Sequence, residues 1–184
     1  RWSRVLGESG KKLDTLVSKF LELARAESGQ IEDRIEQFSL NDLVEGVVAS
    51  VSSGGLYEGI HFRTNIEVCH VSGSISRIET AIRNVVENAA SFVDPTSGNV
   101  GLTLRIEKNM GVLFVDDDGP GISIKEHENV FKPFYKIDKG RAESKSSVGL
   151  GLSIASDIVR SHGGNIVLDK SKMNGLCVKI FLPV

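Results

Sequence analysis

Two neighbouring apolar runs near the middle of this 184-residue chain constrain its fold more than any other feature. The runs span Val100 to Ile106 and Val112 to Val115, and a short polar turn around Lys108 and Asn109 separates them. Two strand-like segments joined by so short a turn predict a β-hairpin. The second run ends in a cluster of acids and glycines, so the hairpin leads directly into a polar loop.

Helical and strand-like hydrophobic periods alternate on either side of this hairpin. Ser39 and Asp42 have the spacing of a capping box and open a helical pattern that runs through Val51. Apolar residues recur with the helical period over 74–92 and again from about Leu150 to Ser161. Strands are predicted over 60–66, near 166–168 and over 176–182. These elements predict an α+β fold, a two-layer sandwich of a mixed β-sheet with helices packed on one face.

The first part of the chain has a different character. Apolar residues recur with the helical period from Val5 to Ala26, Ser28 and Gly29 end that pattern, and a polar stretch follows. We therefore expect a helical arm over 1–29, a linker over 30–38 and a folded domain over 39–184. Because the first residue is not Met and no signal peptide is visible, the chain is expected to be a fragment of a longer protein.

Composition excludes several classes of function. Lys and Arg total 22 against 24 for Asp and Glu, and a net charge of -2 gives no global attraction to nucleic acid or anionic lipid. No apolar run approaches the roughly 20 residues that a membrane-spanning helix needs. The two cysteines, Cys69 and Cys177, stand apart in strand-like settings and are expected to be buried free thiols.

A first candidate site lies in the helical pattern over 74–92. Asn84 and Asn88 are four residues apart, so they project from the same helix face. Paired amides can ligate a divalent cation through their carbonyl oxygens, and Mg²⁺ commonly takes few protein ligands together with phosphates. The alternative is two ordinary solvated asparagines.

Two further segments carry glycines beside polar or helical residues. In the segment from Asp116 to Gly121, the glycines permit close backbone approach to a ligand, and a carboxylate can accept a hydrogen bond from an amine such as that of adenine. The three acids could equally bind a cation or simply occupy a turn. In the segment from Ser147 to Leu152, two glycines lead into a helix, whose N-terminus suits phosphate oxygens. Neither a P-loop nor the full dinucleotide fingerprint is present.

The ordered set of these segments resembles the catalytic domain of sensor histidine kinases, in the superfamily that also contains gyrase, heat-shock chaperones and mismatch-repair ATPases. The family's N, G1, F and G2 boxes match, in order, residues 84–90, 117–121, 131–134 and 149–152. Residues 23–29 also resemble the end of the family's second dimerisation helix. The resemblance therefore covers nearly the whole chain and implies the family's ATP-binding fold.

The resemblance also implies a role for each matching residue. Asn88, with Asn84 beside it, would hold Mg²⁺, and Asp117 would receive the adenine amino group. A mobile lid over ATP would span about 122–148 and supply Lys136 and Arg141 to the terminal phosphates. The remaining nucleotide-binding positions would be Phe92, Gly119, Gly121, Gly149, Leu150, Gly151 and Leu152.

By the same resemblance the chain would bind Mg-ATP and transfer the γ-phosphoryl group to a histidine, for relay to an aspartate of a response regulator. The protein would act in the cytoplasm, as a homodimer formed through the helical arm. Two departures stand out. Ser91 replaces a basic residue that is common after the N box, and Ser147-Val148 replaces a Gly-Thr or Gly-Ser pair. Asn84 occupies the place of a water-activating glutamate, and because an amide cannot act as a base, slow ATP hydrolysis is expected.

The four histidines do not match the family's phosphoacceptor. We expect His61 in a strand, His70 in a loop, His127 in the lid and His162 at a helix end. The acceptor helix is therefore expected outside this chain, and the chain alone is expected not to phosphorylate itself. Two alternatives remain open: a degenerate nucleotide-binding interaction module, and a serine kinase of the anti-sigma-factor type, which the arm disfavours.

Overall fold

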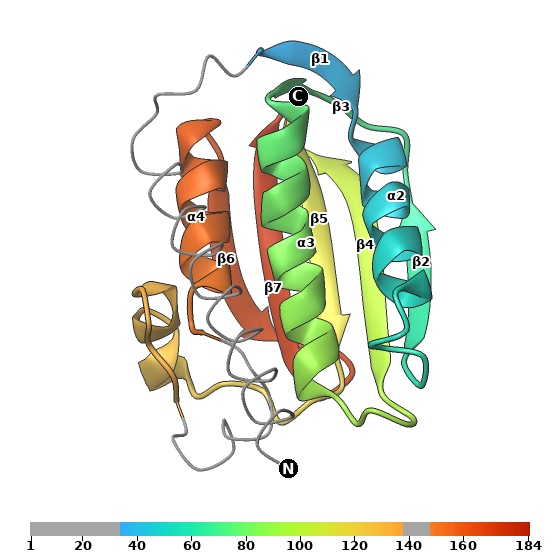
Figure 1. Ribbon diagram of the computed structural model, residues 1–184. Helices are drawn as coiled ribbons and strands as arrows, with labels where there is room; N and C mark the ends of the chain where they lie inside the picture. The colour runs from blue at the N-terminus through green and yellow to red at the C-terminus, as the bar shows by residue number, and fades with distance from the viewer. Residues whose placement is uncertain (1–33, 138–147) are drawn as a thin grey trace, which may run out of the picture.

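A mixed β-sheet forms one layer of the domain, and helices cover one of its faces (Figure 1). The computed structural model describes residues 34–137 and 148–184. The predicted helical arm, residues 30–33 of the predicted linker and Arg141 lie outside the described residues. The two-layer α+β architecture that the sequence predicts is confirmed.

Among the described residues the main sheet has five strands in the order β2-β4-β5-β7-β6. Strand β2 pairs parallel with β4, whereas the other neighbours pair antiparallel. The predicted hairpin is formed by β4 and β5, and Lys108 and Asn109 at its turn have φ of 48° and 65°. Two central residues with positive φ match the right-handed twist of the flanking strands. The bounds are β2 His61–Ile66, β4 Asn99–Glu107, β5 Met110–Asp117, β6 Asn165–Lys170 and β7 Leu176–Pro183.

Three α-helices of the described residues lie on the same face of this sheet (Figure 1). Helix α2 covers Leu40–Ser53, and its capping residue Ser39 accepts a hydrogen bond from the backbone of Asp42 at 3.2 Å, as the capping pattern predicts. Helix α3 covers Ile75–Phe92 and lies at the centre of the layer. Helix α4 covers Gly151–Ser161 and ends before Gly163, whose φ of 72° suits a residue without a side chain.

The hydrophobic core fills the space between the helices and the inner face of the sheet. Leu102, Val115, Val178 and Leu168 face one another across four strands, and all are buried. Successive side chains along a strand point to opposite faces of the sheet. The residues directly before and after each of these four therefore point away from the helices. Phe114 lies on that outer face, where the Arg105 guanidinium sits 4.5 Å from the centre of its ring.

A second, two-stranded sheet was not predicted. Strand β1, Glu36–Ser39, covers the end of the stretch expected to be linker and the first residue of the predicted domain, and it pairs antiparallel with β3, His70–Gly73. The prediction that His70 lies in a loop is therefore wrong. Each strand is only four residues long. In so short a segment the alternation of polar and apolar residues that marks a strand cannot be told from the irregular pattern of a loop. No helix in residues 34–137 or 148–184 is long and apolar enough to cross a membrane.

Candidate functional site

The three adjacent acids at the end of β5 have three different environments. Asp117 follows Leu113 and Val115 on the inner face of the sheet and is only 3% exposed. Asp116 faces outward, opposite Cys177 of β7. The carboxylate of Asp118 accepts hydrogen bonds from the backbone and side-chain nitrogens of Asn99 at 3.0 and 2.8 Å. Asp117 is therefore the acid that faces the interior between sheet and helices.

The carboxylate of Asp117 is held by the backbone. Its Oδ1 accepts hydrogen bonds from the amides of Gly119 at 2.9 Å and Leu176 at 3.0 Å. Burial raises the pKa of Asp117 above its ordinary value, and these two backbone hydrogen bonds partly offset the increase. A carboxylate in such a setting is a strong acceptor for one further donor.

The two asparagines of α3 differ in their surroundings. Asn84 is 5% exposed, and its amide donates to the Thr80 carbonyl at 2.9 Å. Asn88 is half-buried, and within residues 34–137 and 148–184 its side chain has no hydrogen-bond partner. A ligand oxygen must be free to approach an ion, so Asn88 is the better candidate for a metal ligand.

The start of α4 abuts the same face of α3. A Cβ atom added at Gly151 would lie 3.2 Å from Asn84 Oδ1, so a side chain there would press on the asparagine. Gly149 has φ of 77°, and its carbonyl accepts a hydrogen bond from Phe134 at 2.9 Å. No side chain in the described residues caps this helix at Leu150, so its first amides remain available to an anion.

Two of the remaining candidate residues are exposed. Phe92, the last residue of α3, is 54% exposed, and Lys136 is exposed. Ser91 donates to the Glu87 carbonyl at 2.7 Å and lies 3.2 Å from the Tyr57 hydroxyl. A neutral hydrogen-bonded pair therefore occupies the position where the family commonly carries a basic residue.

Two residues that contact Asp117 were missed by the sequence analysis. Gly175 and Leu176 lie at the start of β7 and approach the carboxylate from a segment far away in sequence. The dipeptide Asn174-Gly175 signals a turn and nothing more. Leu176 and Asp117 are 59 residues apart in the sequence, so no local sequence pattern indicates the contact between them.

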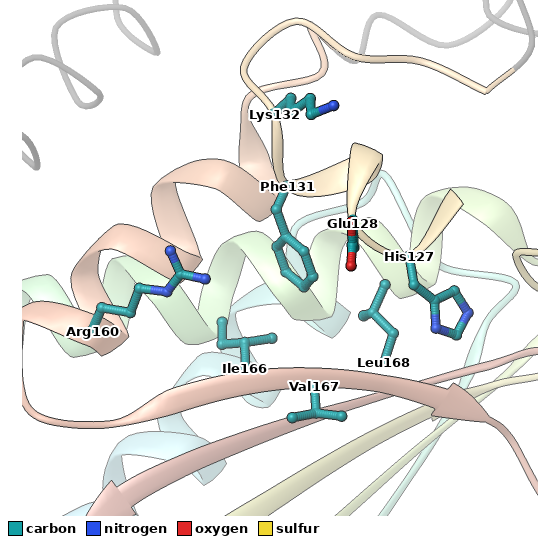
Figure 2. A pocket seen from close by; sticks show the side chains of 8 residues that line it. All are labelled: His127, Glu128, Phe131, Lys132, Arg160, Ile166, Val167 and Leu168. Carbon is teal, nitrogen blue, oxygen red and sulfur yellow. The ribbon is translucent and has the colours of Figure 1, made fainter. Parts of the chain in front are cut away.

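A cavity of about 590 Å³ lies away from these residues, between α4, β6 and the segment after β5. Figure 2 shows the Phe131 ring between Arg160 of α4 and Leu168 of β6, with His127 at the far side. None of the predicted nucleotide-binding residues within the described ranges lines this cavity. It is a separate feature of the surface.

The histidines and cysteines of the described residues are spread over several elements. His61 lies in β2, and His162 ends α4, as predicted. His127 follows a short 3₁₀ helix, η1, which covers Ile124–Glu126, and a second, η2, covers Asn129–Phe131. Both cysteines are buried and free, as expected. No group of three His, Cys, Asp or Glu side chains among the described residues could hold a metal ion.

Comparison with known proteins places this chain in a family. Residues 73–184 match the family described as histidine kinase-, DNA gyrase B-, and HSP90-like ATPase. The sensor protein CutS of Streptomyces coelicolor is 30% identical over 181 residues, which are 98% of this chain and 43% of CutS. The sensor histidine kinase CpxA of Escherichia coli is 35% identical over 112 residues, 61% of this chain and 24% of CpxA. The chain thus spans less than half the length of these relatives.

Solved structures agree with the sequence relatives. The mycobacterial sensor histidine kinase MprB superposes with a TM-score of 0.70 and 28% identity, over 82% of this chain and 97% of that one. The full-length ShkA structure, in complex with AMPPNP, superposes with a TM-score of 0.82 and 25% identity, over 99% of this chain and 38% of ShkA. This chain therefore shares the fold of these kinases.

Proposed function

The chain belongs to the histidine kinase-, DNA gyrase B-, and HSP90-like ATPase family, and we propose that it binds Mg-ATP and presents the γ-phosphoryl group to a histidine held by another segment of the same protein. It is a catalytic ATPase domain of the two-component sensor histidine kinase type. The observation that carries the proposal is the buried Asp117 carboxylate, which the backbone holds at one oxygen.

Asp117 selects the base in this proposal. Adenine carries an amino group at C6, which can donate to the carboxylate, whereas guanine carries a carbonyl there. The other Asp117 oxygen, Oδ2, receives no hydrogen bond from the described residues. Because no fully buried side-chain oxygen among the described residues lacks a partner, Oδ2 is not fully enclosed. An unpaired carboxylate oxygen of this kind is the acceptor that the amino group of adenine needs.

The phosphates would extend from Asp117 toward α3 and the start of α4. Asn88 offers a free amide oxygen to Mg²⁺, and Asn84 lies one helical turn away, closer to Gly151. When bound, Mg²⁺ would neutralise charge on the phosphate oxygens. The uncapped amides at the start of α4 and the exposed Lys136 would orient the terminal phosphate, together with Arg141.

The nucleophile would come from an acceptor helix of the same protein. Positioning and charge neutralisation are the main contributions of a protein to phosphoryl transfer, so the domain needs no catalytic base of its own. We further propose that the full protein dimerises and passes the phosphoryl group to a response regulator. The names of the relatives, sensor proteins and sensor histidine kinases, support this assignment.

Label transfer tests the proposed reaction. This chain is incubated with Mg²⁺ and γ-labelled ATP, alone and together with a longer form of the protein that carries the upstream helix and Asn88→Ala. We expect acid-labile label on the longer form and none on the chain alone. Label on His61, His70, His127 or His162 of the chain, or no transfer in the mixture, would contradict the proposal.

A further inference from the structure

The turn between β6 and β7 closes tightly over the Asp117 carboxylate. The Ser171 amide donates to the Gly175 carbonyl at 3.0 Å, and the Asn174 amide donates to the Ser171 carbonyl at 3.1 Å. A third hydrogen bond, from the Met173 amide to the Ser171 hydroxyl at 3.0 Å, braces the same turn. Ser171 and Gly175 are both buried, so the two ends of this turn pack into the domain.

Gly175 leaves no room for a side chain against Asp117. A Cβ atom added there would lie 2.2 Å from Asp117 Oδ1, 2.4 Å from the Asp117 carbonyl oxygen and 2.7 Å from the Gly119 nitrogen. Carbon and oxygen atoms that are not bonded do not approach so closely. The Gly175 amide also donates to the Asp117 carbonyl at 3.2 Å, so the two backbones are joined at this point.

The two oxygens of the Asp117 carboxylate therefore have different roles. Oδ1 accepts the Gly119 and Leu176 amides, which occupy both of its lone pairs. Oδ2 is left as the oxygen that can accept from a ligand. The Leu176 amide reaches Oδ1 only because Gly175, its neighbour in the chain, lies directly against the carboxylate.

We propose that Gly175, braced by the turn from Ser171, is a positioning residue that sets nucleotide specificity by holding Asp117 with Oδ2 toward the C6 substituent of the purine. This inference rests on the proposed function, because it needs adenine at Asp117. Gly175 itself does not touch the nucleotide in this account. It acts through the orientation of Asp117.

The test compares Mg-ATP with Mg-ITP, whose hypoxanthine base differs from adenine at C6 and in the proton on N1. Dissociation constants are measured by calorimetry for the wild-type chain, Gly175→Ala and Gly46→Ala, and each variant is checked by thermal melting. Gly46 is the control, since a Cβ there would have no other atom within 4 Å. We expect Gly175→Ala to weaken ATP about tenfold or more and ITP less than twofold, and Gly46→Ala to change neither.

Two further variants keep the inference open to refutation. Ser171→Ala removes the hydroxyl that braces the turn and adds no atoms, so it should fold and should lower the ratio of ATP to ITP affinity by a few fold. In the Asp117→Asn background, Gly175→Ala should leave that ratio unchanged, because the two residues act as one unit.

The outcomes separate this inference from the proposed function. If the wild-type chain prefers ATP but Gly175→Ala weakens both nucleotides equally, or Ser171→Ala leaves the ratio unchanged, the role of Gly175 is wrong and the adenine site stands. If Gly175→Ala does not fold, the result with Ser171→Ala decides. If the wild-type chain binds ATP and ITP equally well, the assignment of adenine to Asp117 itself is wrong.

Discussion

Replacing Asp117 by asparagine changes one hydrogen-bonding atom at the centre of the site. The amides of Gly119 and Leu176 both donate to Oδ1, so the asparagine must keep its oxygen there and place its NH₂ group where Oδ2 was. The amino group of adenine would then meet a donor instead of an acceptor. Loss of a hydrogen bond to a charged group costs about 1.5 to 3 kcal/mol, which weakens ATP binding roughly tenfold to a hundredfold.

The same substitution should favour a base with a carbonyl at C6. We therefore expect Asp117→Asn to bind ITP at least as tightly as ATP, measured by calorimetry in the presence of Mg²⁺. Asp117→Ala is the control: it removes both the acceptor and the new donor, so it should weaken ATP without improving ITP. An Asp117→Asn variant that keeps the wild-type preference for ATP would refute the assignment of Asp117 to the base.

Stability gives an independent check on the environment of Asp117. Because burial raises its pKa in the folded state, the folded chain holds this proton to a higher pH than the unfolded chain does. Protonated Asp117 therefore contributes to the free energy of unfolding. This contribution is fully present below the pKa of Asp117 in the unfolded chain and is lost as pH rises through its pKa in the folded chain. Asp117→Asn cannot lose it, so the difference in melting temperature between variant and wild type should move in favour of the variant from acid to neutral pH.

Other substitutions separate binding from folding. Asn88→Ala should abolish Mg²⁺-dependent phosphoryl transfer in the label assay and leave the melting temperature nearly unchanged, because its amide makes no hydrogen bond to the described residues; transfer that survives would place the metal elsewhere. Asn84→Ala should instead lower the stability by about 1 kcal/mol, since it removes a buried hydrogen bond to Thr80, and urea unfolding measures this loss. Burial raises the pKa of both cysteine thiols, that of Cys177 to about 12, so neither should react with a thiol reagent at pH 8 until the chain unfolds. Rapid labelling of the native chain would contradict their burial.

Much of the fold could be predicted because its main elements have strong local patterns. Helix α3 carries an apolar stripe over five turns, and the β4-β5 hairpin joins two apolar runs through a two-residue turn. Patterns of this length are hard to confuse with other structure. Strands β1 and β3 are only four residues long, and they are strands because they pair with each other. Neither segment shows this pairing in its own sequence.

The candidate site could be predicted only in part, because some of its contacts join segments that are distant in the sequence. The three acids at 116–118 could be singled out because glycines follow them, and the resemblance to the kinase family pointed to Asp117 among them. The alternation along β5 explains why it, and neither Asp116 nor Asp118, faces inward, but that assignment needs the register of the sheet. The close approach of Gly175 to its carboxylate and the hydrogen bond from the Leu176 amide depend on tertiary packing. No local sequence pattern indicates either of them.

The most direct test of the account is the nucleotide preference of the chain itself. Calorimetric titration with ATP and with GTP, each with and without Mg²⁺, measures whether a site exists and which base it selects. The account predicts that ATP binds in a Mg²⁺-dependent manner and that GTP binds at least tenfold more weakly, because the Asp117 carboxylate would face the guanine carbonyl. Equal affinity for the two nucleotides, or no binding of ATP, would contradict it.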